Sequence, residues 1–459
     1  TSMPRPSLDA PPPPVAPRDA LARARASGSD GPGPDAADRA EPARPGPATS
    51  TRSVAAAAMV AALLFAVLRL LAQGGDVSAF VHAGDRFTDP GAAHDLTVEP
   101  GSSGYDGQFS YRLARAPLST AERVDGVAFD RPVDRTARIG YPVLAWLASA
   151  GGQRSLVPWA LVGVNVAAIG VVAAAGAVLA RDAGRSAWLG LVVAAAPGLI
   201  VALSRDLTEA VAAAALAGAL VLLRRRRLAA ATVALTFGAL TRETVLVLAL
   251  AVVAAAVLAA LPEHRWPHRL EAVRRRLVDR DPVPAWVGVV PLVAYGAWRA
   301  WLSLGWDAPV GHGGDDPVNG LTVPFLAPLR QVVTFVGDAG DPVALIQLVA
   351  FVLVVAAVVV VVLGAIDDGR RAAVAGDDDG GTADGVVAGH ERVAVALAVA
   401  LLVSLTTWDR AVVFLRYPTD VLVLGAAVVP AAGVALVRRS IQVAVPTGLV
   451  AAGLWLAIA

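Results

Sequence analysis

Residues 342–365 read PVALIQLVAFVLVVAAVVVVVLGA and contain no charged side chain. An α-helix needs about 20 apolar residues to cross the hydrocarbon core of a bilayer, so this run is long enough to span one. Ten further apolar segments lie at residues 53–71, 155–180, 186–203, 207–223, 228–241, 243–261, 284–304, 393–407, 412–437 and 441–458. The sequence therefore predicts an all-α polytopic membrane protein with about 11 transmembrane helices, within a range of about 10–12.

The composition agrees with this class and excludes several others. Of the 459 residues, 56% are hydrophobic and 17% are charged, against about 25% charged in soluble domains. The chain has no cysteine, which excludes disulfides, thiolate catalysis and cysteine-based metal sites. A net charge of +1 gives no overall field that would recruit nucleic acid, so we expect no nucleic-acid partner.

The polar segments divide the chain. Residues 1–52 are rich in Pro, Ala, Gly and Arg, and we expect a disordered tail before a membrane domain at 53–459. Three longer connections are expected at 74–154, 305–341 and 366–392. With the tail inside, the basic short loops all fall on the cytoplasmic side, as the positive-inside rule requires. They hold Arg181, Arg185, Arg224 to Arg227, the arginines within residues 262–282, Arg370, Arg371, Arg438 and Arg439. We expect a multi-pass protein of the plasma membrane whose loops 74–154 and 305–341 face outward.

Mixed acids and arginines gather at the outer ends of the predicted helices. Charge within a membrane span is costly and usually faces a protein interior or a wet cavity. Substrate-binding candidates at these ends are Arg205, Asp206, Glu209, Arg242, Glu243, Arg416, Tyr417 and Asp420. The set predicts a polar cavity that opens outward, although helix capping and structural ion pairing explain any single member as well.

The first outer loop carries the remaining candidates. It contains GYDGQFSYRLARAP at residues 104–117 and RIGYP at 138–142. Asp106 is the first candidate for a catalytic acid or base, and Asp85 and Asp89 are its rivals. Alternatively, Asp106 and Gly107 only form a turn, since Asp-Gly is a common turn sequence. Carboxylates and arginines favour general-base catalysis with guanidinium groups that hold a phosphate leaving group. Gln108, Tyr111 and Arg138 are further substrate-binding candidates, and the tyrosines suit a membrane interface equally well.

This arrangement resembles the integral-membrane glycosyltransferases of the C-type fold, over residues 53–459. The loop motifs are similar to those of bacterial members associated with cell-surface glycopolymers. The resemblance implies a lipid bilayer setting, a polyprenyl-phosphate-linked sugar as donor and a cell-envelope glycan or glycolipid as acceptor. The resemblance also implies that Asp106 is the family's first-loop acid, which acts as a base or supports a metal ion. A divalent cation is therefore the one candidate cofactor. Many C-type enzymes have a second acid at the next position, where this chain has Gly107.

Two other functions remain open at this point. A transporter or flippase for a lipid-linked or anionic solute would place its charges near the bilayer midplane, with access from both sides. A non-catalytic scaffold for envelope assembly would use the same charges for ion pairing alone.

Overall fold

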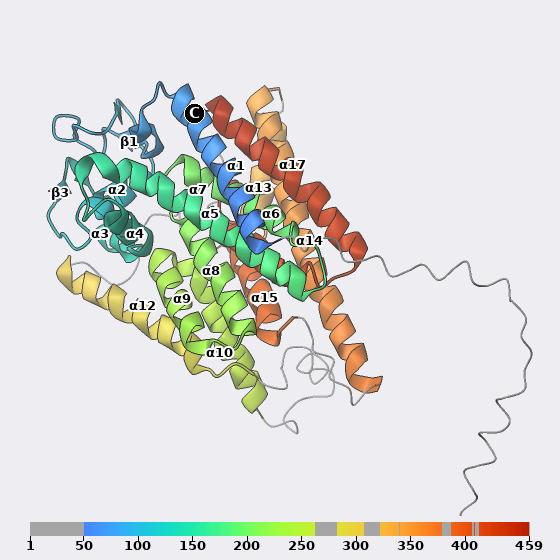
Figure 1. The fold of residues 1–459 in the computed structure, drawn as a ribbon. Coiled ribbons are helices and arrows are strands. Elements are labelled where there is room, and N and C mark those ends of the chain that lie inside the picture. The colour runs from blue at the N-terminus through green and yellow to red at the C-terminus, as the bar shows by residue number, and fades with distance from the viewer. Residues whose placement is uncertain are drawn as a thin grey trace, which may run out of the picture. The chain divides into compact units, whose positions relative to one another are not determined.

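The computed structural model describes residues 50–261, 282–306, 322–338, 340–378, 387–405, 408 and 413–458. Residues 1–49 of the predicted disordered tail and residues 307–321 of the predicted loop 305–341 therefore lie outside the described residues. The described chain is mostly helical and has little sheet (Figure 1). Its long helices are α1 (Thr51–Ala72), α5 (Val157–Asp182), α8 (Glu209–Arg224), α9 (Leu228–Thr241), α10 (Leu246–Ala260), α12 (Trp286–Gly305), α13 (Leu326–Gly337), α14 (Pro342–Asp378), α15 (Gly389–Ser404) and α17 (Val434–Ile458).

Shorter elements fill the connections. The helices are η3 (Val77–Phe80), α2 (Gly107–Arg115), α3 (Pro132–Ala137), α4 (Gly140–Ala148), η4 (Arg154–Leu156), α6 (Leu189–Ala194), α7 (Pro197–Ser204), η5 (Glu243–Val245), η9 (Val413–Leu415) and α16 (Thr419–Val428). Strands β1 (Ala83–Gly84) and β2 (Val98–Glu99) pair in parallel, and β3 (Arg123–Val124) pairs antiparallel with β4 (Val127–Ala128). The loop predicted at 74–154 is thus a compact assembly of short elements.

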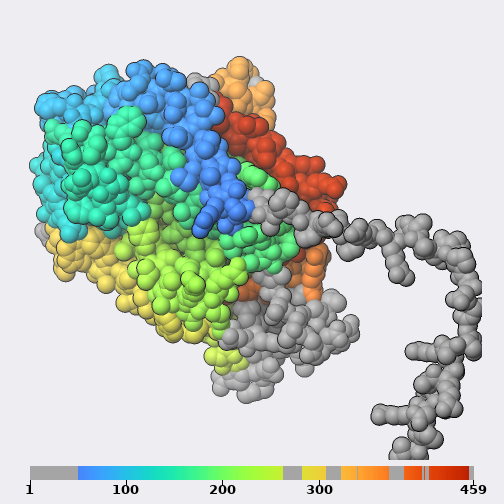
Figure 2. Space-filling view, viewed as in Figure 1, coloured from blue at the N-terminus to red at the C-terminus, as the bar shows by residue number. Residues whose placement is uncertain are grey.

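Six helical segments among the described residues are long and apolar enough to cross a membrane, and they are Thr51–Ala72, Arg154–Asp182, Glu243–Ala260, Trp286–Gly305, Pro342–Arg371 and Val434–Gly453. Large apolar side chains are exposed along them, including Leu63 at 55%, Leu304 at 84% and Leu449 at 70%. Helix α1 lies on the surface in Figure 2. Such extensive apolar exposure suits hydrocarbon rather than water, so the chain is an all-α protein with a bilayer environment.

The other predicted spans are shorter or broken, so the predicted number of about 11 is not confirmed. The segment predicted at 186–203 is divided into α6 and α7, because Pro197 occupies the first turn of α7 and cannot continue the preceding helix. The segment predicted at 412–437 is divided among η9, the ten-residue α16 and the first turn of α17. A turn at residues 430–433, which contains Pro430 and Gly433, separates α16 from α17.

The helices pack through one continuous apolar core. Helix α5 contacts α1, α6 and α8, while α8 also contacts α9 and α16. Helices α10, α12 and α15 form a second group of neighbours, and α14 packs against α16 and α17. Figure 1 shows α2, α3 and α4 gathered beside one end of this bundle. They join it through contacts of α4 with α5 and α9, and of α3 with α12.

The opposite end of the bundle carries most of the arginines that were expected to set orientation, and we call it the arginine end. Two of them form ion pairs between helices, Arg224 with Glu391 at 2.7 Å and Arg225 with Asp182 at 2.9 Å. At the same end, Arg392 of α15 pairs with Asp368 of α14 at 2.6 Å. The Arg224–Glu391 pair is nearly buried and bidentate. These arginines therefore join helices at this end, in addition to any effect on topology.

Candidate functional site

The predicted acids and arginines meet where loop 74–154 covers the helix ends opposite the arginine end. Asp106 stands directly before α2, and its side chain is 32% exposed. Its Oδ1 accepts a hydrogen bond from Arg135 at 2.8 Å, and its Oδ2 accepts one from Arg416 at 3.3 Å. Although burial alone raises the pKa of the Asp106 carboxyl, the charges of these two arginines hold it well below its usual range. Asp106 is therefore fully ionised at neutral pH.

Arg416 connects the loop to the helices. It follows η9 directly, and its Nε donates to Glu209 Oε1 at 2.6 Å, while its Nη1 donates to the Tyr105 hydroxyl at 3.1 Å. Together with the bond to Asp106, the guanidinium joins two segments that are far apart in the sequence, residues 105–106 of the loop and the start of α8. Its side chain is only 11% exposed, so these contacts fix its position.

The deepest part of the cluster is an ion pair between two helix ends. Glu209 is the first residue of α8, and Arg242 directly follows α9. Arg242 donates to the same carboxylate oxygen that accepts from Arg416, and the side chains of Glu209 and Arg242 are 1% and 5% exposed. A buried carboxylate is stable when cations and hydrogen bonds compensate its lost hydration, and two guanidinium groups do so here.

A second, more accessible pair borders the first. Arg138, just after α3, donates to both carboxylate oxygens of Glu243, at 2.6 and 3.1 Å. The two side chains are 30% and 39% exposed. Tyr417 and Asp420 complete this side of the cluster: the Arg242 guanidinium lies 5.8 Å from the centre of the Tyr417 ring and attracts Asp420 electrostatically. We call Asp106, Glu209, Glu243, Asp420 and the four arginines at 135, 138, 242 and 416 the acid–arginine cluster.

Arg205 and Asp206 lie beside the cluster in the turn before α8. Both are buried, with exposed fractions of 7% and 0%, and Asp206 has a left-handed backbone with φ of 47°. The Arg205 guanidinium lies 5.4 Å from the Tyr105 ring centre, and the Arg416 guanidinium lies 5.3 Å from the same point. Tyr105 therefore links these two sequence-predicted arginines.

A histidine lies near the same arginines. His82 Nδ1 is 3.3 Å from a carboxylate oxygen of Glu99. Burial, followed by the positive charges of Arg205 and Arg69, lowers the pKa of His82 to about 4. The imidazole is therefore neutral at physiological pH.

Other loop candidates hold the loop together. Asp85 is exposed and accepts from the backbone N–H groups of Gly101 and Ser102, at 2.7 and 3.2 Å. The Asp89 carboxylate likewise accepts from the N–H of Gly91, at 2.9 Å.

Gln108 and Tyr111 are almost fully buried. The Gln108 side chain accepts from the Thr88 hydroxyl at 2.8 Å and donates to the Ser103 carbonyl at 2.9 Å. Burial, the largest cause, raises the pKa of Tyr111 to about 12. The structure places both residues inside the loop assembly rather than on the acid–arginine cluster.

Three functional or supporting residues were missed from the sequence. Arg135 lies one helical turn before Arg138, a spacing that places both on the same side of α3 and was a usable signal. Tyr105 stands next to Asp106 within the quoted motif. Arg112 gave no local signal, because its partners are the carbonyl oxygens of residues 121, 122 and 127, which a loop brings to it.

A small cavity lies against the exposed side of Asp106. It has about 320 Å³ of empty space, and its walls are Asp106, Phe109, Ser110, Leu113, Arg135, Arg138, Pro142, Leu207, Thr208 and Arg416. The charged groups in this lining are three arginines and one aspartate. The lining therefore suits an anion such as a phosphate, with a carboxylate beside it.

The same residues do not fit a divalent cation. Among the described residues, no group of three or more His, Asp or Glu side chains is arranged to hold a metal. Both oxygens of Asp106 already face guanidinium groups, and a cation there would meet positive charge. A Cβ atom on Gly107 would collide with the carbonyl oxygens of Arg205 and Val81, so the backbone leaves no room for a second acid at that position.

Comparisons with known proteins add no identification. No protein-family model matches the chain, and no curated protein or solved structure matches it either.

Proposed function

We propose that the protein is a membrane glycosyltransferase that moves a sugar from a polyprenyl-phosphate donor to a cell-envelope acceptor. The reaction would take place at the acid–arginine cluster, on the outer side of the plasma membrane. The resemblance of the loop motifs at 105–114 and 138–142 to C-type glycosyltransferases supports this class.

The observation that carries the proposal is the lining of the cavity beside Asp106. Three guanidinium groups, those of Arg135, Arg138 and Arg416, share this space with a single carboxylate. Guanidinium groups bind phosphate through charge-assisted, often bidentate hydrogen bonds. In the proposed reaction they bind the phosphate of the donor and stabilise the negative charge that develops on it as the sugar departs.

Bond changes in the transfer balance without a cofactor. The acceptor hydroxyl oxygen forms a bond to the anomeric carbon, and the bond from that carbon to the phosphate oxygen breaks. The electron pair leaves with the polyprenyl phosphate, and the acceptor proton moves to Asp106.

Asp106 is a weak base while both of its oxygens accept from arginines, because these hold its pKa low. A phosphate bound to Arg416 and Arg135 would compete for their hydrogen bonds and offset their charge. The pKa of Asp106 would then rise, so donor binding itself would make this carboxylate a better base.

The position of the cluster suits a lipid-linked donor. The candidate membrane span Glu243–Ala260 begins with a residue of the cluster, so the charged groups lie at the end of a membrane helix. A phosphate at this level would leave its polyprenyl chain free to extend along apolar helices into the bilayer.

The test compares two aspartates of the same loop. The purified protein is incubated with a panel of polyprenyl-phosphate sugars and membrane extract as acceptor, and release of polyprenyl phosphate is measured. Asp106→Asn is expected to reduce release at least 100-fold, a typical contribution of a general base. The matched control, Asp85→Asn, changes an aspartate outside the cluster and is expected to keep activity.

Three outcomes would contradict the proposal. Full release by Asp106→Asn would remove the proposed base, and loss of release by Asp85→Asn alone would move the reaction to the rival acid. Lipid transfer across the bilayer with no release of polyprenyl phosphate would favour a flippase.

A further inference from the structure

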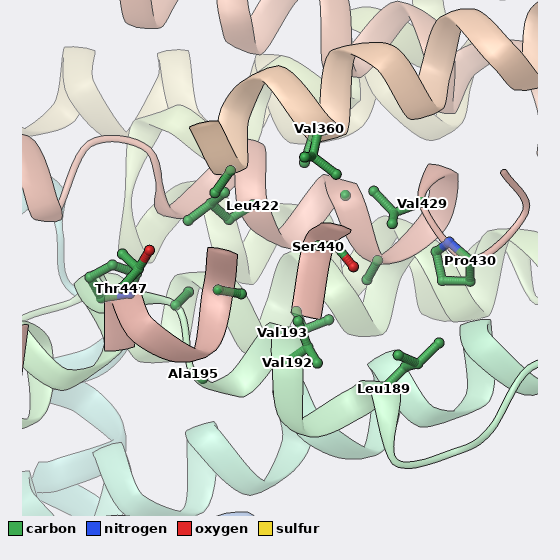
Figure 3. Close-up of a pocket in the computed structure, with 17 residues that line it drawn as sticks. Leu189, Val192, Val193, Ala195, Val360, Leu422, Val429, Pro430, Ser440 and Thr447 are labelled. Carbon is green, nitrogen blue, oxygen red and sulfur yellow. The ribbon is translucent and has the colours of Figure 1, made fainter. Parts of the chain in front are cut away.

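A second cavity lies away from the acid–arginine cluster and is apolar. It has about 640 Å³ of empty space, part of it open to the surroundings, between α6, α7, α14, α16 and α17. In Figure 3, Leu189 and Pro430 lie on one side of this space and Ala195 and Thr447 on the other. Pro430 follows α16 at the arginine end, so the cavity extends from that end toward the middle of the bundle.

The two hydroxyl groups in the lining have no hydrogen left to donate to a polar ligand. Ser440 donates to the carbonyl oxygen of Val437 at 2.7 Å, and Thr447 donates to that of Val443 at 2.6 Å. Both hydroxyl hydrogens are therefore used within α17. The cavity favours hydrocarbon as its occupant, because an apolar space of this kind gives water too few hydrogen-bond partners.

Arginines surround the turn at the arginine end of the cavity. Arg185 donates to the carbonyl oxygens of Pro430 and Ala432, at 3.1 and 2.9 Å. Arg371 donates to another carbonyl of the same turn at 3.4 Å, and pairs with Asp367 at 2.8 Å.

Two further arginines stand at the start of α17. Arg438 and Arg439 are exposed and directly precede Ser440, which lines the cavity. Asp367 offsets the charge of Arg371 but not that of Arg185, Arg438 or Arg439, so the arginine end of the cavity has an excess of positive charge. A ligand with a hydrocarbon chain and an anionic head matches both features.

We propose that this cavity binds an acyl chain of an anionic phospholipid, whose headgroup phosphate meets Arg438 and Arg439. An anionic leaflet attracts arginines at a membrane surface with about 1 kcal/mol each. The lipid would stabilise the junction of α16 and α17 with α6 and α14. This site is separate from the proposed donor site and does not depend on the glycosyltransferase proposal.

The experiment measures lipid affinity of the whole protein in detergent by native mass spectrometry. Dioleoyl phosphatidylglycerol is the anionic probe, and dioleoyl phosphatidylcholine is the zwitterionic probe with the same chains. The double variant Arg438→Gln/Arg439→Gln is expected to bind phosphatidylglycerol about 30-fold more weakly. The matched control Arg226→Gln/Arg227→Gln removes the same charge from exposed positions at the arginine end and is expected to bind normally. Ala444→Phe fills the cavity and is expected to abolish binding of this lipid.

Several results would overturn the inference. The unmodified protein could bind both lipids with equal affinity, or the two double variants could lose equal affinity for phosphatidylglycerol. Unchanged binding of phosphatidylglycerol by Ala444→Phe would also overturn it. Polyprenyl phosphate also serves as a third probe. If Ala444→Phe removed binding of polyprenyl phosphate and kept that of phosphatidylglycerol, the cavity would belong to the donor chain instead.

Discussion

The acid–arginine cluster contains two glutamates that differ chiefly in depth, and this difference predicts unequal effects of the same substitution. Glu209 is 1% exposed and accepts from two guanidinium groups, whereas Glu243 is 39% exposed and pairs with Arg138. Glutamine has nearly the same shape as glutamate but no charge. Glu209→Gln therefore removes the buried anion that Arg242 and Arg416 share and leaves Arg416 with Asp106 alone, while Glu243→Gln leaves one partly hydrated arginine.

The magnitudes follow from burial. Breaking a buried ion pair by removing one partner costs about 3–5 kcal/mol, because the remaining charge stays uncompensated. An exposed pair contributes about 0.2–1 kcal/mol, since water screens and hydrates both groups. We expect the loss of stability from Glu209→Gln to be at least about three times that from Glu243→Gln.

Thermal unfolding in detergent tests this expectation. The ten tryptophans report unfolding by intrinsic fluorescence, so no label is needed. The unmodified protein and both variants are compared at the same protein and detergent concentrations. Equal decreases in Tm, or a larger decrease for Glu243→Gln, would refute the argument that burial determines the strength of these pairs.

Three further predictions concern residues around the cluster. Gly198→Ala would place a Cβ into the Thr419 hydroxyl and against the carbonyl oxygens of Leu415 and Arg416, so the segment that holds Arg416 must shift and we expect weaker binding of a fluorescent polyprenyl phosphate. Gly163→Ala, whose Cβ meets open space, is the unaffected control, and equal affinities of the two variants would contradict the close packing. Arg112→Lys removes the planar guanidinium that donates to three backbone carbonyls, so we expect the free energy of unfolding to fall by about 2–3 kcal/mol. We also expect thermolysin to cleave faster within residues 116–131. An unchanged cleavage rate would show that Arg112 does not hold this loop. The low pKa of His82 means that the unfolded chain binds a proton that the folded chain does not, so stability falls by up to roughly 3 kcal/mol as pH drops from about 6.5 to about 4. His82→Gln should reduce this pH dependence of Tm, and an identical pH profile would rule out His82 as its source.

The sequence was sufficient to find most of the cluster, because charges in apolar runs are conspicuous. Glu209, Arg242 and Arg416 each stand at the edge of an apolar segment, and the structure joins all three through one carboxylate oxygen. The partners within the group could not be derived, since they depend on how α8, α9 and η9 pack.

Long-range geometry also explains what the sequence left open. The requirement for Gly107 comes from the carbonyl of Arg205, almost a hundred residues away, so no local pattern could indicate it. Arg112 is similar, because its acceptors are placed by the β3–β4 hairpin. Apolar length alone overestimated the helix at 186–203, where Pro197 starts a new helix, and at 412–437, where a turn intervenes.

A structure with a bound polyprenyl-phosphate analogue tests the central claim most directly. We predict that its phosphate oxygens lie within hydrogen-bond distance of Arg416 and at least one of Arg135 and Arg138, with the direct bond from Arg416 to Asp106 replaced. A phosphate bound at the arginine end, with the hydrogen bonds of Asp106 unchanged, would contradict the assignment of the acid–arginine cluster as the donor site.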